Sequence, residues 1–150
     1  MTKNPRGDPY MNDTEKVLEY LVGGEQLENV KNSLDEVYYE YGSPFITVCR
    51  TCGEFYVCLL IRRTPLGGED YNDEVLGIVV FVDNTYPLDG KVELVVKKAT
   101  VIRSYGKKTG FYVPREYLEL IVGKLCGRPS RNERIGIHAM KIEEATIFLD

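Results

Sequence analysis

Four cysteines and one histidine are the residues of this sequence best suited to metal or redox chemistry. Cys49 and Cys52 form a Cys-x-x-Cys-Gly motif between two segments rich in β-branched and aromatic residues. Redox motifs of this kind stand at the start of a helix, whose dipole lowers the thiol pKa, so the strand context argues against that chemistry.

The same context matches one knuckle of a zinc ribbon, in which a tight turn aims two thiolates at one ion. A structural zinc site needs two further ligands, and only Cys58, Cys126 or His138 could supply them, one at a time. We therefore favour buried thiols or a disulfide over zinc. The sequence predicts no metal site and no cofactor.

Two further patterns in the sequence fall short of a catalytic or binding motif. The run from Gly106 to Gly110 has Val101 where a phosphate-binding loop needs glycine, and a second lysine interrupts it. The following run, Lys108 to Val113, has part of an RNA-binding strand pattern, which Pro114 interrupts. His138 has no nucleophile and acid beside it in the sequence. We therefore expect no catalytic residues and no enzymatic activity.

The charge of the chain is divided unevenly along its length. Residues 1–96 hold 8 Lys and Arg against 17 Asp and Glu, a net charge of −9, whereas residues 97–134 hold 10 against 3, or +7. Residues 135–150 carry 1 against 3, which restores the total of −4. Such asymmetry indicates a partner of opposite sign, or docking of the basic part on the protein's own acidic part or on a second copy.

The basic segment offers candidate nucleic-acid contacts around one turn, one helix start and one loop. Lysine and arginine at such places can neutralise phosphates, and arginine can read guanine edges. The predicted nucleic-acid-binding residues are Arg103, Lys107, Lys108, Arg115, Arg128 and Arg131.

Hydrophobic periodicity predicts the elements that position these residues. Two helices, near residues 12–22 and 25–41, are separated by Gly23-Gly24. Residues 45–50 and 54–63 predict a hairpin, 64–74 a flexible acidic connection, and 75–83 a buried strand. A long strand is expected over 91–104, with a break at Lys97-Lys98, and a short one over 110–113. A helix then begins at Pro114, a basic loop covers 126–134, and residues 135–140 and 145–149 form a closing hairpin.

These elements predict an α+β fold, in which an N-terminal αα-hairpin packs on a mainly antiparallel β-sheet or barrel and a short C-terminal helix stands between strands. We expect a flexible tail over 1–12, a unit over 13–96 and a basic unit over 97–150, or one continuous domain. No apolar run approaches the ~20 residues of a membrane span, and residues 1–12 do not resemble a signal peptide. The expected location is the cytoplasm.

A basic strand, residues 100–107, leads through a glycine-containing turn to Val113-Pro114-Arg115-Glu116 and a short helix. With this pattern, residues 98–150 resemble the AbrB/SpoVT-type swapped-hairpin DNA-binding domain. The resemblance implies an intertwined homodimer in which Arg103, Lys107, Lys108 and Arg115 face DNA. The longer loop over 126–134 and the inserted Lys108-Thr109 depart from the family pattern.

We therefore expect a small regulator-like protein that binds nucleic acid, with duplex DNA favoured, as a homodimer. The alternative is a structural or assembly subunit, a β-rich homo-oligomer whose basic face binds an acidic protein partner. The two differ in retention on heparin and in the size of the oligomer.

Overall fold

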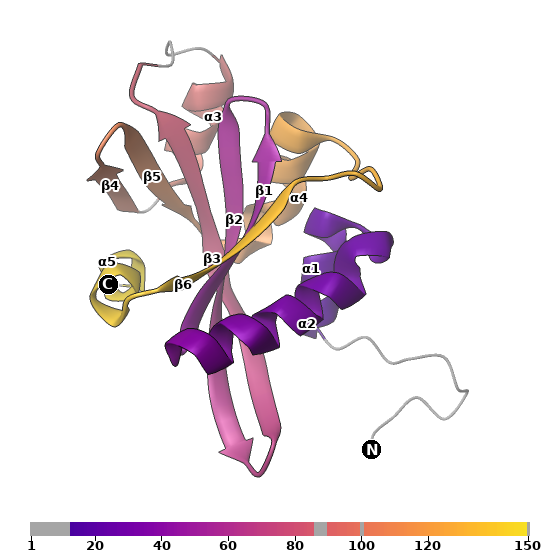
Figure 1. Cartoon of the computed structure of the whole chain (residues 1–150). Helices are drawn as coiled ribbons and strands as arrows, with labels where there is room; N and C mark the ends of the chain where they lie inside the picture. The colour runs from indigo at the N-terminus through magenta and orange to yellow at the C-terminus, as the bar shows by residue number, and fades with distance from the viewer. Residues whose placement is uncertain (1–12, 86–89, 100, 150) are drawn as a thin grey trace.

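The computed structural model describes residues 13–85, 90–99 and 101–149 (Figure 1). The predicted tail over 1–12 therefore lies outside the described residues. In chain order the elements are α1 (Asp13–Val22), α2 (Gly24–Tyr41), β1 (Phe45–Cys52), β2 (Phe55–Gly67), β3 (Asp70–Asp83), α3 (Gly90–Lys98), β4 (Val101–Tyr105), β5 (Lys108–Val113), a 3-10 turn (Arg115–Tyr117), α4 (Leu118–Ile121), a π-helical turn (Val122–Cys126), β6 (Ile135–Met140) and α5 (Ile142–Leu149).

The described strands form one antiparallel sheet of six strands in the order β4-β5-β3-β2-β1-β6. The sheet is open, because β4 and β6 lie at its two edges and do not pair with each other. The α+β class is confirmed, with the two N-terminal helices packed on the sheet and α4 standing between β5 and β6. Strands from the predicted unit over residues 97–150 lie on both sides of β1, β2 and β3: β5 pairs with β3, and β6 pairs with β1.

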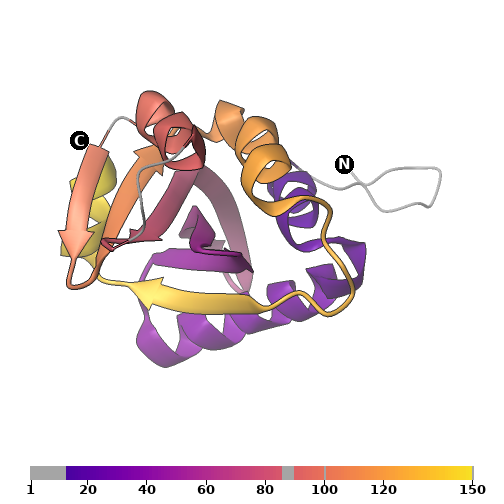
Figure 2. The ribbon, with the colours of Figure 1, turned by 90° about the horizontal axis from the view of Figure 1, so that it is seen from above.

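The two faces of the sheet are covered very differently. One face packs against α1, α2, α3 and α4 in a large apolar cluster that includes Leu18, Leu34, Val95 and Ile121. Viewed from above, α3, α4 and α1 stand in a row along this side (Figure 2). The other face has a smaller cluster, to which α5 contributes Ala145 and Phe148. Only part of that second face is therefore covered by a helix within the described chain.

The predicted N-terminal helices are confirmed, and a glycine ends each of them. Gly23 has φ +89° and Gly42 has φ +68°, in the region that L side chains rarely adopt. The Gly42 N–H donates to the carbonyl of Tyr38 and so caps α2.

The segment 64–74 is not a flexible connection, so that prediction is wrong. It forms a long hairpin in which β2 continues to Gly67 and β3 begins at Asp70. Cross-strand ion pairs stabilise the extension: Arg62 bonds Glu74 at 2.7 Å, and Arg63 bonds Asp73 at 2.8 Å. We call residues 62–74 the arm, since it extends well beyond the other elements (Figure 1).

The base of the arm is held by the buried guanidinium of Arg63. Nε and Nη2 donate to the two carboxylate oxygens of Asp73, both at 2.8 Å, and Nη1 donates to Asp35 on α2 at 2.9 Å. The rings of Tyr38 and Tyr71 lie within 5.4 Å and 4.7 Å of the guanidinium carbon, at cation–π distance. The hydrogen bonds to Asp73 raise the pKa of Arg63, which keeps this group charged. These contacts fix the arm to the helical side of the sheet.

The predicted strand over 91–104 is also wrong, because its first part is the helix α3. The β-branched residues of this segment suggested a strand, but Val92 and Val95, three residues apart, are the two that the helix buries. Lys97 and Lys98 lie in its last turn, where cations stabilise a helix C-terminus. Only residues 101–105 form a strand, β4.

The predicted closing hairpin is half correct. Residues 135–140 form β6, whereas 145–149 lie in α5. The Lys141 N–H donates to the Glu144 carboxylate at 3.1 Å, which is a helix-capping bond, and the apolar residues Ala145 and Phe148 share one buried helical face. The short apolar run over 145–149 is compatible with a strand, but the buried residues Ala145 and Phe148 are three apart, which fits one face of a helix.

Candidate nucleic-acid interface

Five of the six predicted basic residues lie in three different places, and the sixth lies in β4. Lys107 and Lys108 lie at the β4–β5 turn, Arg115 lies beside α1, and the remaining pair, Arg128 and Arg131, lies in the loop that precedes β6. Arg103 is in β4, opposite Gly110 of β5, and its side chain lies outside the described part. The structure therefore does not bring the six residues together on one surface.

The β4–β5 turn is a tight two-residue connection, Gly106-Lys107. Gly106 has φ +61°, a value that favours glycine at this position of a hairpin turn. Lys107 and Lys108 are exposed, and no described carboxylate lies within ion-pair distance of either. This turn therefore presents two adjacent positive charges to solvent.

Asn84, which the sequence did not single out, braces this turn from the end of β3. Its side-chain amide donates to the Gly106 carbonyl at 3.0 Å, and its backbone N–H donates to the Lys107 carbonyl at 2.7 Å. The Thr109 hydroxyl in turn donates to the Asn84 amide oxygen at 2.5 Å. Three bonds thus fix the position of the lysine pair relative to the sheet.

Replacing Asn84 by alanine removes both side-chain bonds. We expect the free energy of unfolding to fall by about 1 kcal/mol, the usual net value for exposed hydrogen bonds. We also expect the backbone N–H of residue 84, which donates to the Lys107 carbonyl, to exchange with solvent faster in the variant. Amide exchange followed by NMR tests this, and Asn132→Ala, in the loop that precedes β6, is the matched control. Unchanged exchange at residue 84 would contradict the bracing role.

One acidic residue lies near the lysine pair. Asp83 accepts bonds from the hydroxyl and the backbone N–H of Thr85, at 2.7 and 2.8 Å. These bonds hold the pKa of Asp83 below its ordinary value, and Lys108 and Lys107 lower it further. The carboxylate is thus ionised at neutral pH and partly offsets the charge of the turn.

Arg115 is committed to contacts within the chain. It forms an ion pair with Asp13 at the start of α1 and donates to the Val75 carbonyl at 3.3 Å. Its partner lies 102 residues away in the sequence, which no local pattern reveals. The arginine joins the start of α1 to the segment after β5.

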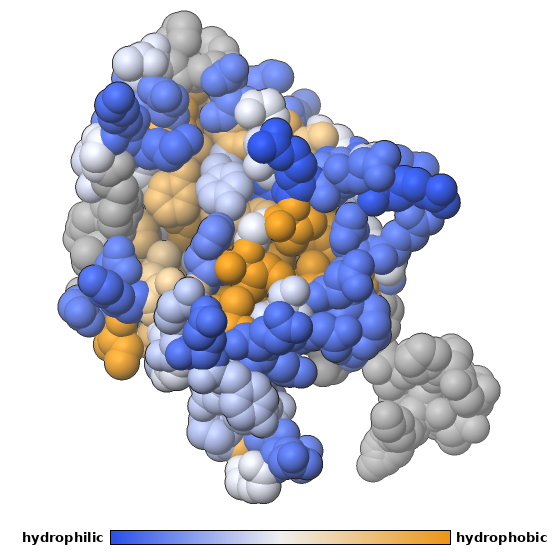
Figure 3. Space-filling view, in the orientation of Figure 1, coloured by the Kyte–Doolittle hydropathy of each residue, from blue (hydrophilic) through white to orange (hydrophobic). Residues whose placement is uncertain are grey.

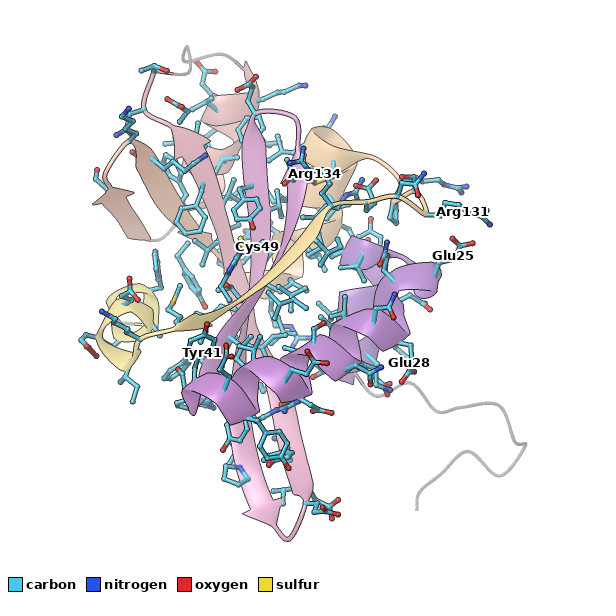
Figure 4. The ribbon with its side chains drawn as sticks, viewed as in Figure 1. Glu25, Glu28, Tyr41, Cys49, Arg131 and Arg134 are labelled. Carbon is cyan, nitrogen blue, oxygen red and sulfur yellow. A yellow bond between two sulfur atoms is a disulfide. The ribbon has the colours of Figure 1, made fainter. Side chains whose placement is uncertain are left out.

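Arg131 is paired as well. Nε and Nη2 donate to the Glu25 carboxylate at 3.2 and 3.3 Å, and the amide of Gln26 donates to the Arg131 carbonyl at 3.0 Å. Figure 4 shows Arg131 on the loop next to Glu25 at the start of α2. Part of the basic segment therefore docks on the acidic half of the same chain, one of the possibilities that the charge asymmetry raised.

The loop that carries Arg128 and Arg131 is organised by Arg50, whose side chain is 2% exposed. The guanidinium donates to both carboxylate oxygens of Glu133, at 3.1 and 3.2 Å. It also donates to the carbonyls of Leu21, Cys126 and Arg128, at 3.1–3.2 Å. Arg50 is the only charged residue of β1, and this sequence signal for its role was missed.

The cysteines form two disulfides, Cys49–Cys58 and Cys52–Cys126. Side chains alternate along a strand, so residues 49 and 52 of β1 point to opposite faces of the sheet and cannot share one ion. Cys52 belongs to the large cluster and Cys49 to the small one. No group of three or more His, Cys, Asp or Glu residues in the described chain is placed to hold a metal ion.

The partly uncovered face of the sheet carries three aromatic rings that no local sequence pattern connects. Tyr56 lies opposite Phe81 in the β2–β3 register, and their ring centroids are 6.5 Å apart. His138 of β6 lies on the other side of Tyr56, with centroids 6.4 Å apart. The Tyr56 hydroxyl is hydrogen-bonded to His138 Nε2 at 3.1 Å, and burial raises the pKa of Tyr56. We call these three residues the ring row.

Comparison with known proteins identifies no relative of this chain. No protein-family model, no curated protein and no solved structure matches the chain. Within the part of the chain that the structure describes, no helix has the length and apolar character to cross a membrane.

Proposed function

We propose that this chain is a non-enzymatic, regulator-like nucleic-acid-binding protein whose principal phosphate contacts are Lys107 and Lys108. The observation that supports the proposal most is the exposed lysine pair on the braced β4–β5 turn. Ammonium groups at a protruding turn reach phosphate oxygens without desolvating a buried charge. The resemblance of residues 98–150 to a swapped-hairpin DNA-binding domain supports the same turn and adds a homodimer to the proposal.

Two of the six predicted contact residues, Arg115 and Arg131, are not part of the proposed interface. Arg115 and Arg131 hold carboxylates of the same chain, and recruiting them would break those ion pairs. Arg128 is exposed and remains a secondary candidate for a phosphate contact. The core of the proposed interface is therefore the turn itself.

A structural or assembly subunit remains the second candidate, and the end of α2 favours it. Tyr39 and Tyr41 are 73% and 64% exposed, and Leu66 of the arm is 65% exposed. Exposed tyrosines are frequent anchors of protein interfaces. A large oligomer that is not retained on heparin would favour this candidate over nucleic-acid binding.

Charge reversal at the turn tests the proposed function. We expect Lys107→Glu/Lys108→Glu to weaken binding of labelled oligonucleotides at least about tenfold at about 50 mM salt, because two phosphate contacts become repulsive. The slope of log affinity against log salt should fall by about 1.5, the counterion release of two contacts. Fluorescence anisotropy across a salt titration measures both quantities.

Lys16→Glu/Lys124→Glu is the matched control, since both lysines are exposed, lie on α1 and on the π-helical turn after α4, and change the net charge equally. If the control variant loses as much affinity as the turn variant, binding depends on net charge and not on this turn. If the native chain binds no oligonucleotide at low salt, the proposed function is wrong.

A further inference from the structure

The ring row crosses the sheet from β3 to the edge strand β6 and joins the β2–β3 hairpin to a strand that is distant in the sequence. Phe81 is on β3, Tyr56 on β2 and His138 on β6, with β1 between the last two. The ring centroids of Phe81 and Tyr56 are 6.5 Å apart and those of Tyr56 and His138 are 6.4 Å apart, so the row is at most about 13 Å long. Such a length accommodates two or three splayed bases on a sheet surface.

The positions beside the ring row carry small or hydroxyl side chains. Gly110 on β5 is opposite Phe81, and Thr51 on β1 is opposite Tyr56. Gly136, on β6, lies next to Tyr56: a Cβ there would stand 2.5 Å from the Tyr56 hydroxyl. Glycine at 110 leaves the flank of Phe81 without a side chain, and glycine at 136 allows the tyrosine to lie across β6.

No described helix covers this part of the sheet. The helices α1–α4 pack on the opposite face, and α5 contributes Ala145 and Phe148 to a cluster that includes Phe45 and Leu60. Tyr56 and Phe81 are half-buried at the margin of that cluster, and His138 is exposed. The space-filling view shows apolar and aromatic surface open to solvent between β6, α5 and the β4–β5 hairpin (Figure 3).

The lysine pair adjoins the same face. Lys108 lies two residues before Gly110 on β5 and opposite Asp83, which lies two residues after Phe81 on β3. Because side chains alternate along a strand, Lys108 leaves the sheet on the face that carries the ring row. Lys107 is its neighbour in the turn. Positive charge therefore stands at one end of a line of rings, which is the combination that proteins use for single strands.

We propose that this face binds single-stranded nucleic acid, with bases stacked on Tyr56, Phe81 and His138 and the sugar–phosphate backbone directed toward Lys107 and Lys108. The inference rests on the proposed function and specifies its substrate class. A duplex cannot use the rings, because its bases are stacked on each other and only their edges are accessible. A single strand can turn its bases outward onto the sheet, and stacking is tolerant of sequence.

The test compares labelled single strands of about 15 nucleotides, oligothymidylate and oligouridylate, with a duplex of the same length. We expect the single strands to bind at least about tenfold more tightly than the duplex, since stacking on each ring stabilises the complex. Comparison of the DNA strand with the RNA strand shows which sugar is preferred.

Two ring variants test the stacking surface. Tyr56→Leu and Phe81→Leu each keep an apolar side chain at the position but remove the aromatic ring. Each should weaken single-strand binding about tenfold and leave duplex binding unchanged. Tyr41→Leu, at an exposed tyrosine on the end of α2 (Figure 4), is the matched control and should leave both unchanged. Thermal unfolding of each variant confirms that the fold is retained.

The outcomes separate the two proposals. Equal or tighter duplex binding that still depends on Lys107 and Lys108 would overturn the single-strand inference and leave the proposed function standing. A ring variant that is folded and binds single strands normally would also overturn the inference. Absence of binding to every oligonucleotide would overturn both. Ultraviolet crosslinking of oligouridylate gives an independent readout, and we expect its peptide adducts at Tyr56, Phe81 or His138.

Discussion

Replacing Arg50 by methionine should lower the free energy of unfolding by about 3–5 kcal/mol, the range for breaking a buried ion pair by removing one partner. Methionine fills most of the space of the arginine stem. It leaves the Glu133 carboxylate, only 16% exposed, without its guanidinium, and leaves the carbonyls of Leu21, Cys126 and Arg128 without this donor. Urea denaturation followed by circular dichroism measures the change.

The matched control is Arg62→Met, one residue from Arg63 on β2. Arg62 is 46% exposed and pairs with Glu74, which is 49% exposed, so its loss should cost no more than about 1 kcal/mol. Amide exchange should also accelerate over residues 127–134 in Arg50→Met, because that loop loses its anchor. A cost equal to that of Arg62→Met would show that the buried network contributes little to stability.

Removing the Cys52–Cys126 disulfide should have an effect of similar size. The bond joins residues 74 apart in the sequence, and the loop-closure model assigns such a cross-link about 4.5 kcal/mol of stability. Cys49–Cys58 closes a loop of only 9 residues, for which the same model gives about 2.5 kcal/mol. We therefore expect Cys52→Ala/Cys126→Ala to be less stable than Cys49→Ala/Cys58→Ala.

Urea denaturation of both double variants without reductant tests this order. Mass spectrometry after thiol alkylation checks that the remaining disulfide is intact in each. Should the variant without Cys49–Cys58 prove the less stable one, contacts of that pair inside the small cluster would outweigh the entropy of the longer loop.

Local signals predicted the parts of the fold whose residues depend mainly on their neighbours. The αα-hairpin has a clear helical spacing and glycine ends, and β1, β2 and β3 are rich in β-branched residues. The wrong predictions concern segments whose secondary structure is determined by tertiary packing. In α3 and α5, apolar residues compatible with a strand are buried at a spacing of three. In the arm, ion pairs with residues across the hairpin and on α2 stabilise strands that have polar sequences.

The candidate site was predictable only in part, for the same reason. The exposed pair Lys107 and Lys108 follows from a polar turn between strands. The pairing of Arg131 depends on Glu25, 106 residues away, and could not be read from the local sequence. The ring row needs the register of four strands: Tyr56 and Phe81 become neighbours only once β2 is paired with β3, and His138 joins them only once β1 is paired with both β2 and β6.

The Cys52–Cys126 disulfide would hold together a chain that has been cut at the tip of the arm. The tip of the arm, at Gly68 and Glu69, lies between these two cysteines in the sequence, whereas Cys49 and Cys58 both precede it. A protease that cleaves the tip leaves two fragments joined by one covalent bridge. They should migrate as a single band on a gel without reductant and as two bands with it. The nicked molecule would keep its acidic and basic portions together even after it has lost continuity of the backbone.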